Sequence, residues 1–245
     1  RYGTVTGVQT CALPISLSLA RKMLVFTVIT TLGLVYNSYL VTGSFDNSLN
    51  MLLIGTIGGL LGYFYTARPI RLVARRGLGE LAIFLTFGPL LTLGALFAIS
   101  SNTVELFSPE FYKAIYIGIP FGFLTTNILF INQFPDTNSD AKTGKNHLIV
   151  TFGKKNARWG YLLILIAAFV SSFALIQTIS NDLSFFNEYF FIAGNVILFV
   201  YGLSAFFNLF KNYDKRELVL SNLKTIYLQI FYGLFIVLAL NLFFV

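Results

Sequence analysis

The stretch YLLILIAAFV, residues 161–170, decides the fold class. All of its residues are apolar, whereas a strand of a membrane barrel alternates apolar and polar residues at about every second position. A helix needs about 20 such residues to cross about 30 Å of hydrocarbon. Working outward from this stretch, we predict seven transmembrane helices, at residues 23–41, 50–66, 79–99, 112–132, 160–180, 187–209 and 223–245. The chain is therefore expected to be an all-α integral membrane protein, a multi-pass helical bundle.

The composition supports the same class. Apolar residues make up 56% of the chain and charged residues 11%, against about 25% charged residues in typical soluble domains. The net charge of +7 resides in loops between apolar segments, so it indicates membrane topology and attraction of anions, with no nucleic acid as partner. No internal repeat or interdomain linker is evident, and no protein partner is inferred. We expect one membrane domain, residues 17–245.

The distribution of Lys and Arg predicts the orientation in the membrane, because short loops rich in these residues stay on the cytoplasmic side. Loops 42–49, 100–111 and 181–186 contain neither residue, and Lys113, just past the second of them, is the exception. The other basic residues precede the first span or fall in the alternate loops: Arg21, Lys22, Arg68, Arg71, Arg75, Arg76, Lys142, Lys145, Lys154, Lys155, Arg158, Lys211, Lys215, Arg216 and Lys224. We therefore expect a cell-membrane protein whose basic loops face the cytoplasm.

Residues 1–16, RYGTVTGVQTCALPIS, require separate treatment. The part VTGVQTCALPI looks like the translation of a sequencing-library adapter, so we interpret residues 1–16 as an artefact. Cys11 is the single cysteine of the chain, and setting it aside excludes disulfides, thiolate metal sites and a cysteine nucleophile from the rest. An adapter joined to coding sequence implies that the natural N-terminus is missing.

The stretch INQFPDTNSDAKTGKNHLI, residues 131–149, holds the candidate site. Asn132, Asp136 and Asp140 recur at a spacing of four, which would place them on one face of a continuing helix at the end of the fourth span. Two carboxylates and an amide suit Mg²⁺, which prefers one or two carboxylates plus substrate phosphates. Lys142 and Lys145 would then contact phosphate oxygens. The alternative is a solvated, charge-balanced loop without a ligand.

These residues carry a resemblance to a known family. The segment from Asn132 to Arg158 resembles the second aspartate-rich motif of the UbiA-type superfamily of intramembrane prenyltransferases. The segment YTARPIRLVARRGLGE, residues 65–80, with the LAIFLTFGPLLTLG that follows, resembles the loop and helix after the fourth span of that family. The family has nine transmembrane helices around a central cavity, so the resemblance implies that residues 17–245 hold the third to ninth.

The resemblance implies both a chemistry and a site. Mg²⁺, as cofactor, would bridge carboxylates and a polyprenyl diphosphate, promote its ionisation, and so allow attack by an electron-rich aromatic acceptor. Asp136 and Asp140 would be the catalytic metal-binding carboxylates, with Asn132 as a supporting ligand. The residues implied in diphosphate binding are Lys145, Arg71, Lys142 and Tyr65. The family's first aspartate-rich motif would lie in the missing part, so this chain as written is expected to be inactive.

The motifs most resemble the branch that acts on 1,4-dihydroxy-2-naphthoate in menaquinone biosynthesis, where prenylation replaces the ring carboxylate. A 4-hydroxybenzoate prenyltransferase of ubiquinone synthesis is one alternative. A small-anion transporter, which would bind without chemical turnover, is another.

Three other features receive less weight. His147, the single histidine of the chain, is not expected to be a catalytic base, and Glu80 is expected to favour a helix N-terminus rather than act as a ligand. The glycines at 55, 58, 59 and 62 predict close packing between helices.

Overall fold

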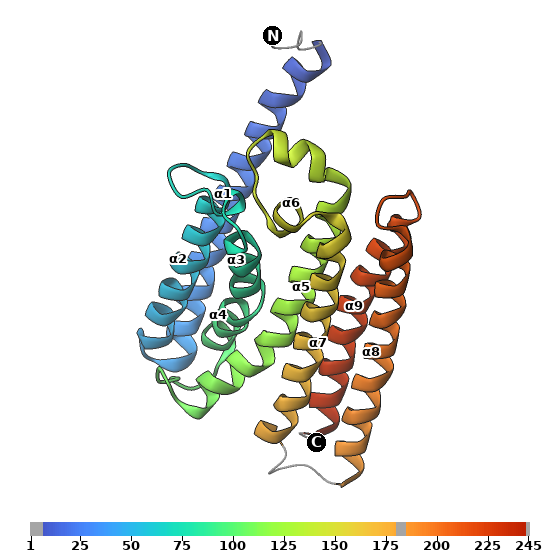
Figure 1. Ribbon diagram of the computed structural model, residues 1–245. Helices are drawn as coiled ribbons and strands as arrows, with labels where there is room; N and C mark the ends of the chain where they lie inside the picture. The colour runs from blue at the N-terminus through green and yellow to red at the C-terminus, as the bar shows by residue number, and fades with distance from the viewer. Residues whose placement is uncertain (1–6, 180–184, 244–245) are drawn as a thin grey trace.

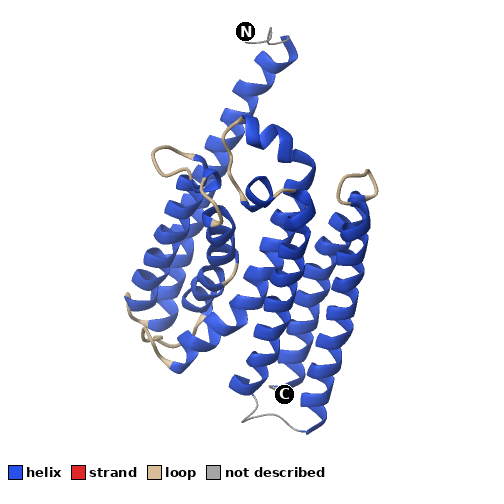
Figure 2. Ribbon diagram, viewed as in Figure 1, coloured by secondary structure: helices blue, strands red, loops and turns tan. Residues whose placement is uncertain are grey.

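The computed structural model describes the backbone of residues 7–179 and 185–243, and the side chains of residues 18–176 and 188–240. All regular elements in these residues are helical, as Figure 2 shows. They are α1 (Gly7–Thr42), α2 (Asp46–Thr66), the 3₁₀ helix η1 (Leu72–Ala74), α3 (Leu78–Phe87), α4 (Pro89–Ile99), α5 (Pro109–Lys142), α6 (Leu148–Phe152), α7 (Lys154–Ile179), α8 (Phe185–Asn212) and α9 (Leu218–Phe243).

The prediction of seven membrane-spanning segments is confirmed. Within the described residues, seven helical segments are long and apolar enough to cross a bilayer, and each overlaps one of the predicted spans. Of the segment interpreted as an adapter, residues 1–6 lie outside the described residues, and residues 7–16 form the start of α1.

The helices form two groups that share α5 (Figure 1). One group consists of α1 to α4 with the first part of α5, and its core includes Met51, Leu93, Phe97 and Phe111. The other consists of α7, α8 and α9 with the later part of α5, around a larger core that includes Phe134. Because α5 contributes to both cores, residues along it have fixed positions relative to both groups.

The third predicted span is broken in the middle, which the sequence analysis did not anticipate. α3 ends at Phe87 and α4 begins at Pro89, so Gly88 separates two short helices. Proline has no N–H to donate to the preceding turn. A Cβ on Gly88 would lie 2.7 Å from the carbonyl oxygen of Gly118, and one on Gly122 would lie 2.6 Å from that of Phe84. Glycine at these positions therefore allows α5 to approach the break backbone to backbone.

The predicted role of the glycines at 55, 58, 59 and 62 was wrong. A Cβ added at any of them meets no atom within 4 Å in the described part of the chain. Gly55 and Gly58 instead line an apolar groove of about 370 Å³ between α1, α2 and α4. Close packing is concentrated at other glycines, including Gly118 and Gly122, because a partner backbone happens to lie opposite them.

The basic loops lie at one end of the molecule. In Figure 1 the α2–α3 connection, the α5–α6–α7 segment and the α8–α9 turn are all at the top, whereas the α1–α2 turn and the α4–α5 loop are at the bottom. The prediction that the basic loops share one face is therefore confirmed. The acidic stretch at the end of α5 lies at this same end.

Candidate functional site

The three oxygen-bearing residues of the motif lie on α5. The fourth span was predicted to end at residue 132, with the motif on a continuation of its helix, and α5 continues through Pro135 to Lys142. With about 3.6 residues per turn, side chains four residues apart are rotated by about 40°, and Asn132, Asp136 and Asp140 therefore share one face. The expectation of a shared helical face is confirmed.

Buried side chains explain why this polar stretch remains helical. Phe134, Thr137 and Asp140 recur at a spacing of three, and each is at most 9% exposed. Phe134 belongs to the larger core, and the Thr137 hydroxyl donates to the Gln133 carbonyl oxygen at 3.0 Å, inside the helix. The packed face therefore keeps the helix intact despite Pro135, while Asn132 and Asp136 remain exposed.

Asp140 differs from Asp136 in its surroundings. Its Oδ1 accepts a hydrogen bond from Lys145 Nζ at 2.7 Å, and its Oδ2 lies 3.2 Å from His147 Nε2. The chain can return to Asp140 because Gly144 adopts a left-handed conformation with φ of 73°, and Lys145 N–H donates to the Asp140 carbonyl oxygen at 3.0 Å. Lys145 and Asp140 therefore form a direct ion pair, a contact that the sequence did not predict, and the contact of Lys145 with diphosphate stays a prediction.

His147 was not expected to have a role at the site. Its Nδ1 accepts a hydrogen bond from the Val150 N–H at 3.4 Å, which caps the N-terminus of α6. A ring nitrogen that accepts carries no proton in the neutral imidazole, so the proton is on Nε2, which donates to Asp140. A cap position directly before the apolar run LIVTF is a sequence signal that could have identified the first of these contacts.

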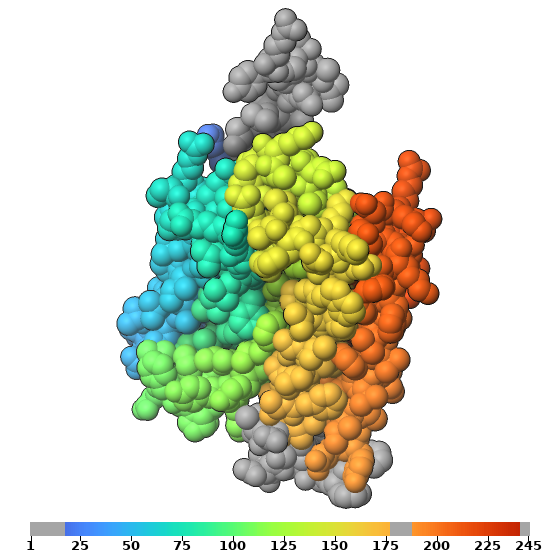
Figure 3. Space-filling view, in the orientation of Figure 1, coloured from blue at the N-terminus to red at the C-terminus, as the bar shows by residue number. Residues whose placement is uncertain are grey.

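Glu80 connects α3 to the same segment. Its Oε1 accepts from the Leu148 N–H, in the first turn of α6, at 3.1 Å. Its Oε2 is buried and has no hydrogen-bond partner among the described residues. Tyr65, at the end of α2, lies beside the start of α3, since a Cβ on Gly79 would be 3.5 Å from Tyr65 Cε2. α2, α3 and α6 therefore meet next to Asp140, and Figure 3 shows the surfaces of the α2–α3 connection and of the α5–α6 segment in contact.

Arg71 comes to the site from the α2–α3 connection. It has a left-handed backbone with φ of 49°, and its Nη2 donates to the Thr143 carbonyl oxygen at 3.1 Å. Lys142 is exposed in the last turn of α5. Two of the predicted diphosphate-binding cations, Arg71 and Lys145, are thus brought to the carboxyl end of α5, although Arg71 and Thr143 are 72 residues apart in sequence.

Asn132 is held by α9. Its Oδ1 accepts from Asn222 Nδ2 at 2.6 Å, a contact across 90 residues that the sequence analysis missed. Asn222 follows an apolar helix start without any motif, so no local signal marks it. The motif is therefore tied to the fold at both ends, to α9 through Asn132 and to α6 through Asp140.

The donor set suits a hard cation. Within residues 18–176 and 188–240, no group of three or more His, Cys, Asp or Glu side chains forms a metal-binding cluster. Two carboxylates and one amide on a single face match the ligands of Mg²⁺, which takes its remaining ligands from water and substrate phosphates. Each carboxylate oxygen has more than one lone pair, so the hydrogen bonds of Asp140 leave acceptor capacity for a cation. The residues present therefore fit Mg²⁺.

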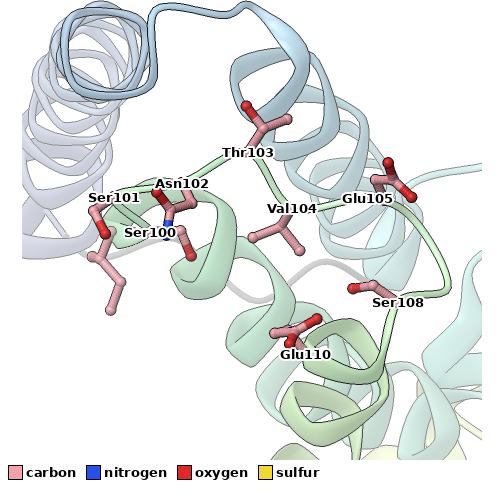
Figure 4. A pocket seen from close by; sticks show the side chains of 9 residues that line it. Ser100, Ser101, Asn102, Thr103, Val104, Glu105, Ser108 and Glu110 are labelled. Carbon is pink, nitrogen blue, oxygen red and sulfur yellow. The ribbon is translucent and has the colours of Figure 1, made fainter.

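A polar pocket of about 600 Å³ lies at the opposite end of the molecule from the aspartate motif. Serine, threonine, asparagine and glutamate side chains of the α4–α5 loop line it (Figure 4). The loop is anchored by buried Asn47, which donates to the Asn102 carbonyl oxygen at 2.9 Å and accepts from the Val104 N–H at 2.8 Å. These contacts stabilise the loop, and the pocket is remote from the aspartate motif.

Comparisons with known proteins extend this description. "UbiA prenyltransferase domain-containing protein 1" of Dictyostelium discoideum is 28% identical over 184 residues, which cover 75% of this chain and 50% of the relative. "1,4-dihydroxy-2-naphthoate octaprenyltransferase" of Escherichia coli is 28% identical over 50% of this chain and 37% of the relative. "2-carboxy-1,4-naphthoquinone phytyltransferase" of Synechocystis is 36% identical over 42% and 31%, respectively.

The chain thus spans half or less of the length of these relatives. No solved structure matches the chain significantly. The sequence profile of the UbiA prenyltransferase family matches residues 12–221, which include the broken third span, all of α5 and the Asn132–Asp136–Asp140 face. This protein belongs to the UbiA prenyltransferase family.

Proposed function

We propose that the protein acts in transfer of a polyprenyl group from a prenyl diphosphate to a small aromatic acceptor, with Mg²⁺ as cofactor and 1,4-dihydroxy-2-naphthoate as acceptor. The observation that carries the proposal is the shared face of Asn132, Asp136 and Asp140 on α5, next to the cations Lys145 and Arg71. Acidic and cationic groups together are what a metal–diphosphate complex requires.

The residues of this chain have separate tasks in the proposal. Asp136 and Asp140 would hold Mg²⁺, with Asn132 as a further oxygen ligand. Lys145, Arg71 and Lys142 would contact the diphosphate oxygens, because a flexible ammonium or a planar guanidinium pairs readily with phosphate. Tyr65, half-buried beside Gly79, would lie near the bound donor.

The bond changes follow from the substrates. The allylic carbon–oxygen bond of the donor breaks, and its electron pair leaves with the diphosphate. Bound Mg²⁺ would offset the charge that develops on that leaving group. A ring carbon of the acceptor forms a new carbon–carbon bond to the allylic carbon. The carboxylate on that ring carbon then departs as carbon dioxide, and the electron pair of the broken bond returns to the ring. Lys145 and Arg71 would stabilise the departing diphosphate by direct contact.

The choice of acceptor rests on the relatives. Those from Escherichia coli and Synechocystis are named for naphthalene-type substrates. The motif residues 65–80, which include the buried Glu80, resemble the same branch. We further propose that the basic end, and with it the mouth of the site, faces the cytoplasm in the cell membrane, as expected for loops rich in Lys and Arg.

The direct test uses membranes that contain the full-length protein, supplied with Mg²⁺ and a polyprenyl diphosphate. We expect faster consumption of 1,4-dihydroxy-2-naphthoate than of 4-hydroxybenzoate, and loss of both activities in Asp136→Asn. The reverse preference would indicate the ubiquinone-type reaction. Binding of the anions without any prenylated product, and without effect of Asp136→Asn, would indicate a transporter and contradict the proposal.

A further inference from the structure

Asp140 has two protein partners that differ sharply in exposure. The Lys145 side chain is 39% exposed, whereas the His147 side chain is 1% exposed, and the Asp140 side chain between them is 12% exposed. Lys145 can therefore exchange Asp140 for water or for an anion with little rearrangement. His147 cannot leave without opening the packing around it.

The orientation of the His147 ring is fixed from three directions. Its Nδ1 accepts from the Val150 N–H, so the ring has a defined position at the start of α6. The next residue, Leu148, donates its N–H to Glu80 Oε1 on α3, which anchors the backbone on which the ring is carried. With Nδ1 as acceptor, Nε2–H is directed to Asp140 Oδ2 at 3.2 Å.

We propose that His147 is a positioning residue for the metal-binding carboxylate of Asp140. Its Nε2–H holds Oδ2 in one orientation, so that the remaining lone pairs of the carboxylate are aimed along the Asn132–Asp136–Asp140 face of α5. Groups that hydrogen-bond to metal-ligating side chains orient them in this way, and their loss typically lowers metal affinity by about 10–100-fold. The inference rests on the proposed function, because it assigns His147 a task in Mg²⁺ binding.

The same geometry assigns a different task to Lys145. It pairs with Asp140 Oδ1, and because its side chain is partly exposed it would be free to turn to the oxygens of a bound diphosphate. His147 keeps its contact in both states, because the buried ring is held at the start of α6 by the Val150 N–H and cannot leave without opening the packing around it.

Two substitutions separate this role from a purely structural one. His147→Asn places an amide oxygen near the position of Nδ1 and can still cap α6, but its side chain is too short to reach Asp140. His147→Gln places an amide nitrogen near the position of Nε2 and can still donate to Asp140, but it loses the cap. A positioning role predicts that metal affinity falls only in His147→Asn, which loses the contact with Asp140. A structural role predicts instead that metal affinity falls in whichever variant has the lower thermal stability.

The test measures Mn²⁺ binding to the chain in lipid nanodiscs, from the electron paramagnetic resonance signal of free Mn²⁺, without donor or acceptor. We expect His147→Asn to weaken binding by about 10–100-fold. His147→Gln should stay within about threefold of the unsubstituted chain, although it melts at a lower temperature. In an Asp140→Asn background, His147→Asn should cause no further loss, because it acts through Asp140.

Equal affinity in all three proteins would overturn the proposal, and so would affinities that rank with melting temperature. Binding by the unsubstituted chain that is no tighter than that of Asp140→Asn would also overturn it, since Asp140 would then hold no cation. The readout does not depend on turnover. The expected Mn²⁺ pattern in this chain, combined with no prenylation of either acceptor by the full-length protein, would contradict the proposed function and leave the role of His147 intact.

Discussion

Asp136 and Asp140 are the two carboxylates of one motif on α5, but the structure predicts that they contribute differently to stability. Asp136 is exposed, whereas Asp140 is buried and accepts from both Lys145 and His147. Asp140→Ala would leave the buried His147 Nε2–H without an acceptor. A buried donor that loses its partner costs about 1–3 kcal/mol.

Two smaller effects of Asp140→Ala oppose each other. Loss of the partly exposed pair with Lys145 removes up to about 1 kcal/mol. Removal of a negative charge from the last turn of α5 returns about 0.3–1 kcal/mol, because that end of the helix dipole is negative. The net destabilisation is therefore about 1–3 kcal/mol, whereas Asp136→Ala at an exposed position should remain within about 0.5 kcal/mol.

Thermal unfolding of the two variants in the same detergent tests this difference. For a chain of this size, 1 kcal/mol corresponds to a change in Tm of about 2–4 °C, so Asp140→Ala should lower Tm by about 2–12 °C and Asp136→Ala by less than about 2 °C. Both substitutions should abolish prenyl transfer by the full-length protein. The two variants act as matched controls, since each replaces Asp by Ala inside α5. Equal shifts in Tm would show that the contacts of Asp140 with Lys145 and His147 do not stabilise the fold, and would refute the reasoning.

Three further predictions concern the fold around the site. Gly118→Ala should lower Tm by several degrees, since its Cβ would lie 2.8–2.9 Å from backbone atoms of Gly88 and overpacking costs about 1–3 kcal/mol. Gly55→Ala, the control, should be neutral or slightly stabilising. Equal effects of the two substitutions on Tm would contradict the close packing at Gly118. Glu80→Ala should destabilise by about 1–3 kcal/mol by leaving the first N–H of α6 unpaired, and Glu80→Gln, which keeps an acceptor, should do so less, as chemical denaturation would show. In a Cys11→Ser background, Lys215→Cys should react with a membrane-impermeant maleimide only after the cytoplasmic side is opened. Thr103→Cys should react with the same reagent in intact cells. The opposite pattern would reverse the proposed topology.

The membrane class and the seven spans could be predicted from the sequence because hydrophobic length and the position of cations are local properties of the chain. The same holds for the shared face of Asn132, Asp136 and Asp140, which needs only helical geometry. Whether the helix continues past residue 132 or gives way to a solvated loop stayed open in the sequence, because the buried side chains of Phe134 and Thr137 that keep the helix intact become visible only with their packing partners.

Contacts between distant residues could not be predicted. The pairing of Asn132 with Asn222, of Arg71 with Thr143 and of Glu80 with Leu148 depends on how helices are arranged in space. His147 was not expected to be a catalytic base, and only its two ring contacts, with Val150 and Asp140, define its place at the site. The small residues at 55–62 suggested close packing, but a glycine produces a close contact only if another backbone lies opposite it.

The backbone contact of α5 with the break between α3 and α4 has a consequence for the direction in which the acidic face points. Gly118 and Gly122 determine the rotation of α5 about its own axis, because only the glycine side of the helix can meet Gly88. A rotation by one residue would turn every side chain of α5 by about 100°. Asn132 is 14 residues beyond Gly118, about 21 Å along the helix. The contact of Gly118 with Gly88 therefore helps to fix the direction in which Asn132 points from the helix axis. Gly118 and Gly122, which do not touch the acidic face, therefore contribute to its orientation alongside the direct contacts of Asn132 and Asp140.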